Sequence, residues 1–201
     1  MRTVRVAVLT TVLAGAAIGG GLLAINASGD PAPARVQRPW SAFASSHYGV
    51  SGALPAGWRL AARTQTPHLN DPREIFSAGT FAFPAPEPGC NMLPIAAVRA
   101  VGPDDAFVSV QERGKAVPVT DFPARPARFA TATTDGTPAL LEQCLGAPLR
   151  GSVSSLTFRD GERAFHALVV VGARADRAAA FAVLDRLRFA PGFRPDWDFA
   201  G

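Results

Sequence analysis

Residues that hold metals or act as nucleophiles are scarce in this sequence, which has two cysteines, three histidines and one lysine among its 201 residues. The histidines are His47, His68 and His166, and none of them is spaced as His-x-His or His-x-x-x-His. A zinc site needs three or four converging ligands, so no metal site is predicted. The chain also contains neither a Walker loop nor a dinucleotide fingerprint, and we therefore predict no bound cofactor.

Positive charge is concentrated ahead of the expected domain. The formal net charge of the chain is +4. Arg2, Arg5, Arg35 and Arg38 precede residue 46 together with one acid, Asp30, and leaving these residues out lowers the net charge to +1. A nucleic-acid-binding domain keeps its basic face on the domain itself. The charge distribution therefore argues against nucleic acid as a partner.

The N-terminal residues 1–29 have the pattern of a membrane anchor or a signal peptide. Residues 6–29 carry no charge and follow two arginines. A spanning helix needs about 20 mostly apolar residues, whereas the apolar part of a signal peptide is typically about 7 to 15 residues long. The pattern favours a single membrane-spanning anchor over residues 6–25, with the arginines inside and the remaining chain outside. Secretion after signal cleavage near Ala27, where the residues are small, is the alternative.

Prolines mark residues 30–45 as a semi-rigid linker, because proline fixes φ and extends the residue before it. The motif Gly49-Val-Ser-Gly52 falls short of the Gly-x-Ser-x-Gly nucleophile elbow and lacks the preceding strand. We interpret it as the end of the linker. The extracytoplasmic domain is accordingly placed at residues 46–201.

The first half of this domain alternates between short strand patterns and connections. A helix is predicted over residues 94–101, because Pro94 begins it and Gly102 and Pro103 follow it. The strand 106–113 is expected to be half buried, since apolar and polar residues alternate along it. All predicted strands before residue 150 lie at 58–63, 76–83, 106–113, 129–133 and 139–145.

The second half is dominated by a β-hairpin followed by a helix. Two strand-like runs flank Asp160-Gly161, a dipeptide that accepts the positive φ of a two-residue hairpin loop. With this loop, Leu156 pairs with Phe165 and Ser155 pairs with His166. The residues expected to share the core face are Leu156, Phe158, Phe165, Ala167, Val169 and Val171.

A helix is predicted after the hairpin, with Asp176 as its N-cap and an apolar stripe through Val183 and Leu187. Beyond it, Phe193, Trp197 and Phe199 are expected to fold back. The predicted class is α+β: a mainly antiparallel sheet of about five to six strands with a short middle helix and a C-terminal covering helix, preceded by an N-terminal hydrophobic helix.

Cys90 and Cys144 are the two cysteines, and in an exported protein such a pair is expected to form a disulfide. A catalytic or metal-binding role would need partners at ligand spacing, which the sequence lacks. In the chain-entropy model, closing a loop of about 55 residues stabilises a domain by about 4 kcal/mol.

Four further residues are candidates to face a ligand. The Ser155–His166 pair has the two residue types of a nucleophile and its base, but catalysis also needs an orienting acid and an oxyanion hole. A polar cross-strand pair is the alternative reading of His166. His68 lies in a turn rich in proline and asparagine, and Arg125 and Arg128 lie in an extended connection that is either solvated or able to bind an anionic partner.

Several segments resemble uncharacterised exported or membrane-anchored proteins of actinobacteria. The resemblance covers most of residues 54–189 and implies a location rather than an activity. More faintly, the order of strands and helices is similar to the PsbP/Mog1-like fold, whose members mostly bind proteins or small partners. The segments that carry the resemblance are Leu54-Pro-Ala-Gly-Trp-Arg-Leu60, Phe107-Val-Ser-Val-Gln-Glu-Arg-Gly114, Phe122-Pro-Ala-Arg-Pro-Ala-Arg-Phe129, Phe158-Arg-Asp-Gly-Glu-Arg-Ala-Phe165 and Ala182-Val-Leu-Asp-Arg-Leu-Arg-Phe189.

We therefore expect a non-enzymatic domain that is anchored outside the membrane and binds an envelope protein or a small ligand. A secreted hydrolase that uses His166 is the alternative, and a sensing or spacing role within a larger complex is a third reading. An enzyme should place His166 in a cleft beside a carboxylate. A binding domain should instead show an exposed apolar or arginine-rich surface.

Overall fold

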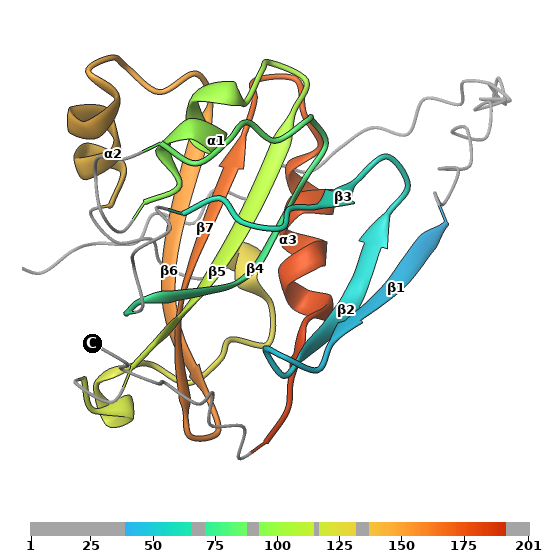
Figure 1. Ribbon diagram of the computed structural model, residues 1–201, viewed down its shortest axis with the longest axis vertical. Helices are drawn as coiled ribbons and strands as arrows, with labels where there is room; N and C mark the ends of the chain where they lie inside the picture. The colour runs from blue at the N-terminus through green and yellow to red at the C-terminus, as the bar shows by residue number, and fades with distance from the viewer. Residues whose placement is uncertain (1–38, 66–70, 88–92, 115–116, 132–136, 192–201) are drawn as a thin grey trace, which may run out of the picture. The chain divides into compact units, whose positions relative to one another are not determined.

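The computed structural model describes residues 39–65, 71–87, 93–114, 117–131 and 137–191. Within these ranges the chain forms two antiparallel sheets and three α-helices (Figure 1). This arrangement confirms the α+β class. The predicted N-terminal hydrophobic helix and the aromatic C-terminal residues lie outside the described ranges.

The larger sheet has five strands, and every neighbouring pair is antiparallel. In spatial order the strands are β3 (Arg59–Leu60), β4 (Arg73–Gly79), β5 (Ala106–Arg113), β7 (Arg163–Val171) and β6 (Ser152–Asp160). All of β7 is buried, as is β5 apart from its last residue. The expectation of a half-buried strand at 106–113 is wrong, because both faces of the sheet are covered at its centre.

The smaller sheet begins inside the predicted linker. Its strands, in the order β1-β2-β8, are β1 (Trp40–Ser45), β2 (Val50–Pro55) and β8 (Arg188–Phe189). The folded part therefore starts at least six residues before the predicted boundary at residue 46. Gly49 and Gly52 belong to the β1–β2 hairpin rather than to a linker end, since Val50–Pro55 pairs along the whole of β1.

The β6–β7 hairpin is present, but its register differs from the prediction by two residues. Phe158 pairs with Phe165, and Asp160 pairs with Arg163, so the loop is Gly161-Glu162. Because side chains alternate with a period of two, a shift by two residues leaves every side chain on its expected face. All six residues predicted to share the core face lie in one buried cluster, which confirms that part of the prediction.

One face of the five-stranded sheet, which we call the first face, packs against α3 (Arg177–Arg186) and the three-stranded sheet. Asp176 caps α3 as predicted, since its carboxylate accepts a hydrogen bond from the N–H of Ala179 at 3.0 Å. Phe181, Val183 and Leu184 bury the inner side of this helix. Figure 1 shows α3 beside β2, between the two sheets.

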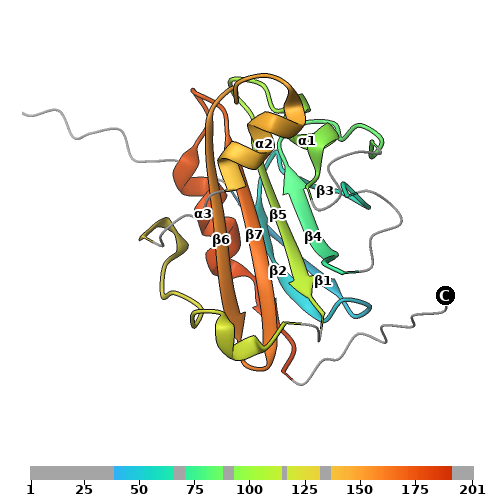
Figure 2. The same cartoon turned by 90° about the vertical axis from the view of Figure 1, so that its left-hand side faces the viewer.

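The opposite face, which we call the second face, carries α1 (Ile95–Ala100) and α2 (Thr137–Leu145) (Figure 2). The helix predicted at 94–101 is thus confirmed. The strand predicted at 139–145 is wrong: alanine, leucine, glutamate and glutamine favour a helix, and Gly146 follows it with φ of 64°.

The remaining predicted strands are shorter than expected or absent. Of the strand predicted at 58–63, only the two residues of β3 form a strand. The strand predicted at 76–83 corresponds to β4, which ends at Gly79, where an added Cβ would lie 2.9 Å from the carbonyl oxygen of Ala106. The predicted strand at 129–133 is wrong as well. Its first three residues form a 3₁₀ turn, η2 (Phe129–Thr131), like η1 (Val119–Asp121) before it.

Candidate functional site

The predicted Ser155–His166 contact exists on the second face. His166 lies in β7 with 6% of its surface exposed, beside Gln111 of β5 and Thr157 of β6. The Oγ of Ser155 lies 2.6 Å from Nε2 of His166, although Ser155 is paired with Leu168 across the strands. The contact is therefore diagonal, which neighbouring strands allow at two residues' offset.

The surroundings of this pair are those of a structural polar row. Ser155 is fully buried. Along the same face, the hydroxyl of Ser77 donates to Ser109 at 3.0 Å and lies 3.1 Å from the hydroxyl of Thr64. The carboxylate of Glu74 accepts from the N–H and the hydroxyl of Thr64. Buried polar groups that bond one another in this way stabilise a sheet without needing a substrate.

A buried charge pair lies on the first face. The guanidinium of Arg163 donates to both carboxylate oxygens of Glu112, at 2.7 and 2.8 Å, and both side chains are at most 4% exposed. Arg163 also donates to the carbonyl oxygens of Tyr48 and Gly49. The pair thereby ties the turn of the β1–β2 hairpin to the five-stranded sheet.

Arg125 has internal partners. Its guanidinium donates to Asp160 at 2.9 Å and to the carbonyl oxygens of Leu184 and Leu187 at the end of α3. A cation near the last carbonyls of a helix is favourable, so the observed contacts of Arg125 are structural ones. Arg128 is more open, with 75% of its side chain exposed and Asp185 at 3.3 Å.

Two other predicted residues lie outside the described ranges. They are His68 and Cys90. Cys144 lies in α2, half buried against the cluster of the second face. The Cys90–Cys144 disulfide stays a prediction, and thiol labelling of the exported, unreduced protein tests it. Labelling of either cysteine without reductant would exclude the bond.

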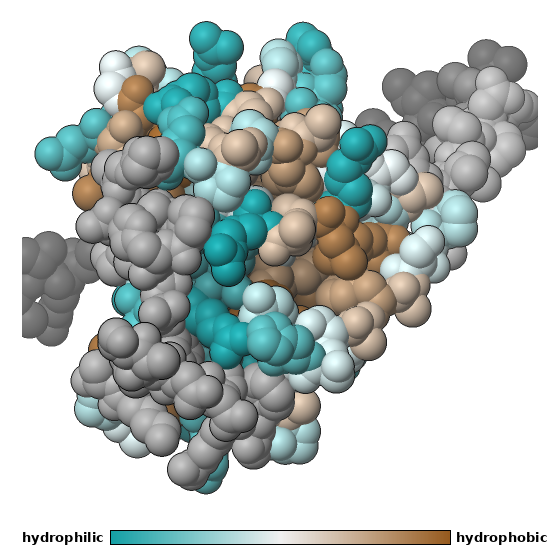
Figure 3. All heavy atoms as spheres, viewed as in Figure 1, coloured by the Kyte–Doolittle hydropathy of each residue, from teal (hydrophilic) through white to brown (hydrophobic). Residues whose placement is uncertain are grey.

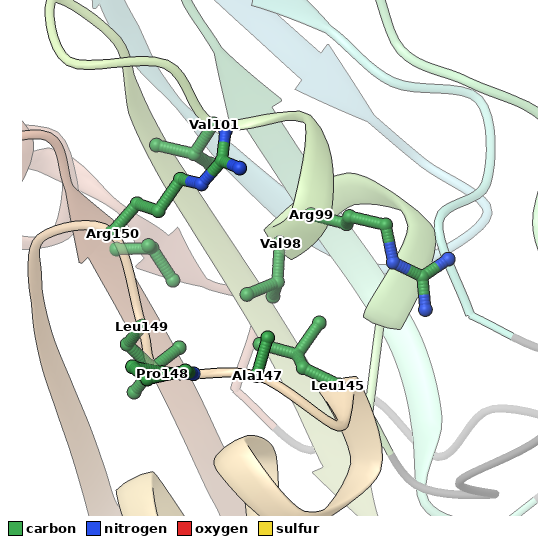
Figure 4. A pocket seen from close by; sticks show the side chains of 9 residues that line it. Val98, Arg99, Val101, Leu145, Ala147, Pro148, Leu149 and Arg150 are labelled. Carbon is green, nitrogen blue, oxygen red and sulfur yellow. The ribbon is translucent and has the colours of Figure 1, made fainter.

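A pocket of about 230 Å³ opens between α1 and the connection from α2 to β6. Figure 4 shows side chains from both walls directed toward it. Its floor includes Val170 of β7. The lining residues are Val98, Arg99, Val101, Leu145, Ala147, Pro148, Leu149, Arg150 and Val170.

The two arginines of this pocket differ in their partners. Arg99 forms an ion pair with Glu87, and in Figure 4 its guanidinium points away from Val98 and Leu145. Arg150 is exposed, and among the described residues no ion-pair or hydrogen-bond partner accompanies it. In Figure 4 it extends toward the end of α1 that carries Val101. Among the described residues, the pocket therefore combines an apolar lining with one arginine, Arg150, whose charge is not balanced by an ion pair.

The carboxyl of Asp104, three residues after Val101, has a lowered pKa. Arg174 donates to both oxygens of Asp104, at 2.8 and 2.6 Å. These hydrogen bonds hold the pKa of the Asp104 carboxyl below its ordinary value of 3.8; desolvation opposes this lowering, and the positive charge of Arg174 adds to it. The same hydrogen bonds raise the pKa of Arg174. The pair stays charged at neutral pH.

A second exposed apolar surface lies over β2 and β3. Figure 3 shows apolar side chains gathered there, and Leu60 of β3 is 49% exposed. Arg59, next to Leu60 in β3, is exposed as well, so this surface also combines apolar side chains with a positive charge. The concave shape distinguishes the pocket from it.

Within the described ranges, no three histidine, cysteine or acidic side chains are grouped so that they could hold a metal ion. The helices described there are also too short or too polar to cross a membrane. No protein-family model, curated protein or solved structure matches the chain.

The sequence did not single out the pocket. One wall comes from α1, which was predicted as a helix. The other wall is the connection after α2, and α2 itself was predicted as a strand. Gly146 and Gly151 bracket the connecting wall, and both have positive φ. Two glycines around Ala147-Pro-Leu-Arg150 were the available signal for a tight, exposed connection next to a helix.

Proposed function

We propose that the chain is a non-enzymatic binding domain that takes a small envelope ligand in the pocket between α1 and the α2–β6 connection. The observation that carries this proposal is the pocket itself. An apolar concavity with a few polar groups at its edge is the usual form of a small-molecule site.

The chemistry of the lining favours binding over catalysis. Among the described residues that line the pocket, no hydroxyl, thiol, imidazole or carboxylate side chain is present. Arg99 and Arg150 supply guanidinium groups, which stay protonated and cannot act as general bases at neutral pH. The lining can bury an apolar group and attract a negative charge, and it lacks the means to transfer a proton.

The proposed location is the outer side of the cytoplasmic membrane. It rests on the uncharged run at residues 6–29 and the arginines before it. Retention of residues 6–25 would anchor the domain, and cleavage near Ala27 would release it. The N-terminal sequence of the protein recovered from cells tells the two apart.

The binding proposal is tested by titrating octan-1-ol into the protein and measuring heat. Octan-1-ol presents an apolar chain without a charge. The variant Ala147→Trp places an indole at an exposed lining position and should abolish binding. Ala56→Trp is the matched control, because Ala56 is exposed in the β2–β3 turn. Saturable binding that only Ala147→Trp removes supports the proposal, and absence of saturable binding overturns it.

A hydrolase remains the second candidate because Ser155 and His166 lie 2.6 Å apart. This geometry suits a serine nucleophile and its base. A fluorophosphonate reagent distinguishes the two functions. Labelling of Ser155 that is lost in the variant His166→Gln would favour the hydrolase. The binding proposal expects Ser155 to stay unlabelled, since its side chain is fully buried.

A further inference from the structure

We infer that the ligand of the pocket is a single-chain aliphatic carboxylate: its chain lies against the apolar lining, and its head group pairs with Arg150. This inference rests on the proposed function and names the class of ligand. It follows from the size of the pocket, from the charges at its edge and from the position of Arg150.

The size of the pocket limits the apolar part of the ligand. Its volume of about 230 Å³ lies below the roughly 300–1,000 Å³ of sites for drug-sized ligands. Val98, Val101 and Val170 surround the space with branched aliphatic side chains, joined by Leu145 and Leu149. These side chains offer no hydrogen-bond donor or acceptor. The space therefore suits one unbranched aliphatic chain better than a polar ring system.

The charges at the edge select a monoanion. Arg99 is balanced by Glu87, so Arg150 leaves one net positive charge among the three. A carboxylate of charge −1 cancels it, whereas a dianionic phosphate would leave an excess negative charge. The planar guanidinium also fits a carboxylate with two parallel hydrogen bonds.

The backbone holds Arg150 at the edge of the sheet. Gly151 follows it with φ of 151°, and an added Cβ there would lie 2.3 Å from the carbonyl oxygen of Val171. The chain can pass this close to β7 only without a side chain at position 151. Arg150 is thereby fixed next to the strand that carries Val170, the floor of the pocket.

The test compares octanoate with octan-1-ol, which differ in the charge of the head group. Binding heats are measured at pH 7, where octanoate is ionised. Octanoate should bind about tenfold tighter or more, the usual effect of a hydrogen bond between charged groups. The variant Arg150→Gln should remove this preference and leave octan-1-ol binding unchanged. Arg59→Gln, at an exposed arginine of β3, should preserve both affinities.

Chain length gives an independent readout. Each added methylene should tighten binding about fourfold until the pocket is full, because burying one CH₂ contributes a fixed free energy. Affinity should then level off for longer acids. An affinity independent of chain length would overturn the inference, since the aliphatic chain would then lie outside the pocket.

The outcomes separate this inference from the proposed function. Equal affinities for octanoate and octan-1-ol would exclude a carboxylate as the ligand class and would leave the proposal of a binding domain standing. If neither octanoate nor octan-1-ol binds, both proposals are overturned. Tighter binding of octyl phosphate than of octanoate at pH 7 would contradict the inferred preference for a head group of charge −1. Binding to phosphatidylglycerol vesicles without any binding of free octanoate overturns the free acid as the ligand.

Discussion

The five-stranded sheet is covered on its first face by α3 and the three-stranded sheet, and on its second face by the shorter helices α1 and α2. The first face carries a chain of four phenylalanines in ring contact, of which Phe129, Phe158 and Phe165 are buried and Phe189 is half-buried, and a salt bridge with both partners enclosed. The second face buries a row of hydrogen-bonded polar side chains and ends in an open pocket. Stability is therefore expected to depend mostly on the first face, and ligand binding on the second.

The largest effect is expected for Phe165→Ala on the first face. Phe165 is fully buried and stacks on Phe189 with ring centroids 4.1 Å apart. Removing its ring should lower the free energy of unfolding by about 3–5 kcal/mol, since the surroundings collapse only partly into the cavity. Urea unfolding followed by circular dichroism measures this change. A loss below 1 kcal/mol would contradict the comparison between the faces.

Breaking the buried ion pair should cost nearly as much. In Glu112→Gln the guanidinium of Arg163 remains buried and loses its opposite charge, which should destabilise the domain by about 3 kcal/mol. The double variant Glu112→Gln/Arg163→Met should recover part of this loss, because no buried charge is left. A double variant less stable than Glu112→Gln would show that the contacts of Arg163 with Tyr48 and Gly49 dominate.

A matched pair of neighbouring valines compares the faces directly. Val169 lies in the cluster of the first face, and Val170 lies at the floor of the pocket on the second. Val169→Ala should cost about 2 kcal/mol and Val170→Ala about 1 kcal/mol, because the second cavity adjoins space that is already open. Thermal unfolding of both variants measures the difference. Equal costs would mean that both faces are packed alike.

The smallest effect is expected at the exposed pair of Asp104 and Arg174. The folded-state pKa of Asp104 is lowered, so its contribution to stability is present above its unfolded pKa and is lost as pH falls through the folded pKa. Arg174→Gln should raise the pKa of Asp104 toward 3.8. A carboxyl-detected NMR titration measures it. An unchanged pKa in the variant would rule out the hydrogen bonds as the cause.

The sequence predicted the core of the fold better than its edges. The hairpin of β6 and β7 was found from Asp160-Gly161, and its core face was right despite the wrong register, because the period of two tolerates an even shift. The helix after Asp176 was found from its cap and apolar stripe. These elements carry their signals within a few consecutive residues.

The missed elements depend on tertiary contacts. Residues 139–145 contain an apolar pair next to polar residues, a pattern that suits either a helix or a strand over so few residues. Phe129 follows no strand pattern of its own: its N–H donates to Asp185, and its ring packs on Phe158. Both contacts join segments far apart in the chain.

The candidate site divides in the same way. The Ser155–His166 contact was predicted because a hairpin register relates nearby residues. The pocket could not be predicted, since it requires Val98 of α1 and Leu149 after α2 to meet across more than forty residues of sequence. Arg150 could not be predicted as a site residue, because nothing in the adjacent sequence distinguishes it from other exposed arginines.

Methyl NMR spectra of the protein with octanoate test the central claim most directly. The account predicts that saturating octanoate shifts the methyl signals of Val98, Val101 and Val170, which line the pocket. The signals of Val169 and of its cross-strand partner Val108, both in the cluster of the first face, should stay in place. Shifts of similar size on both faces, or shifts confined to Val108 and Val169, would contradict a division of the sheet into a stabilising face and a binding face.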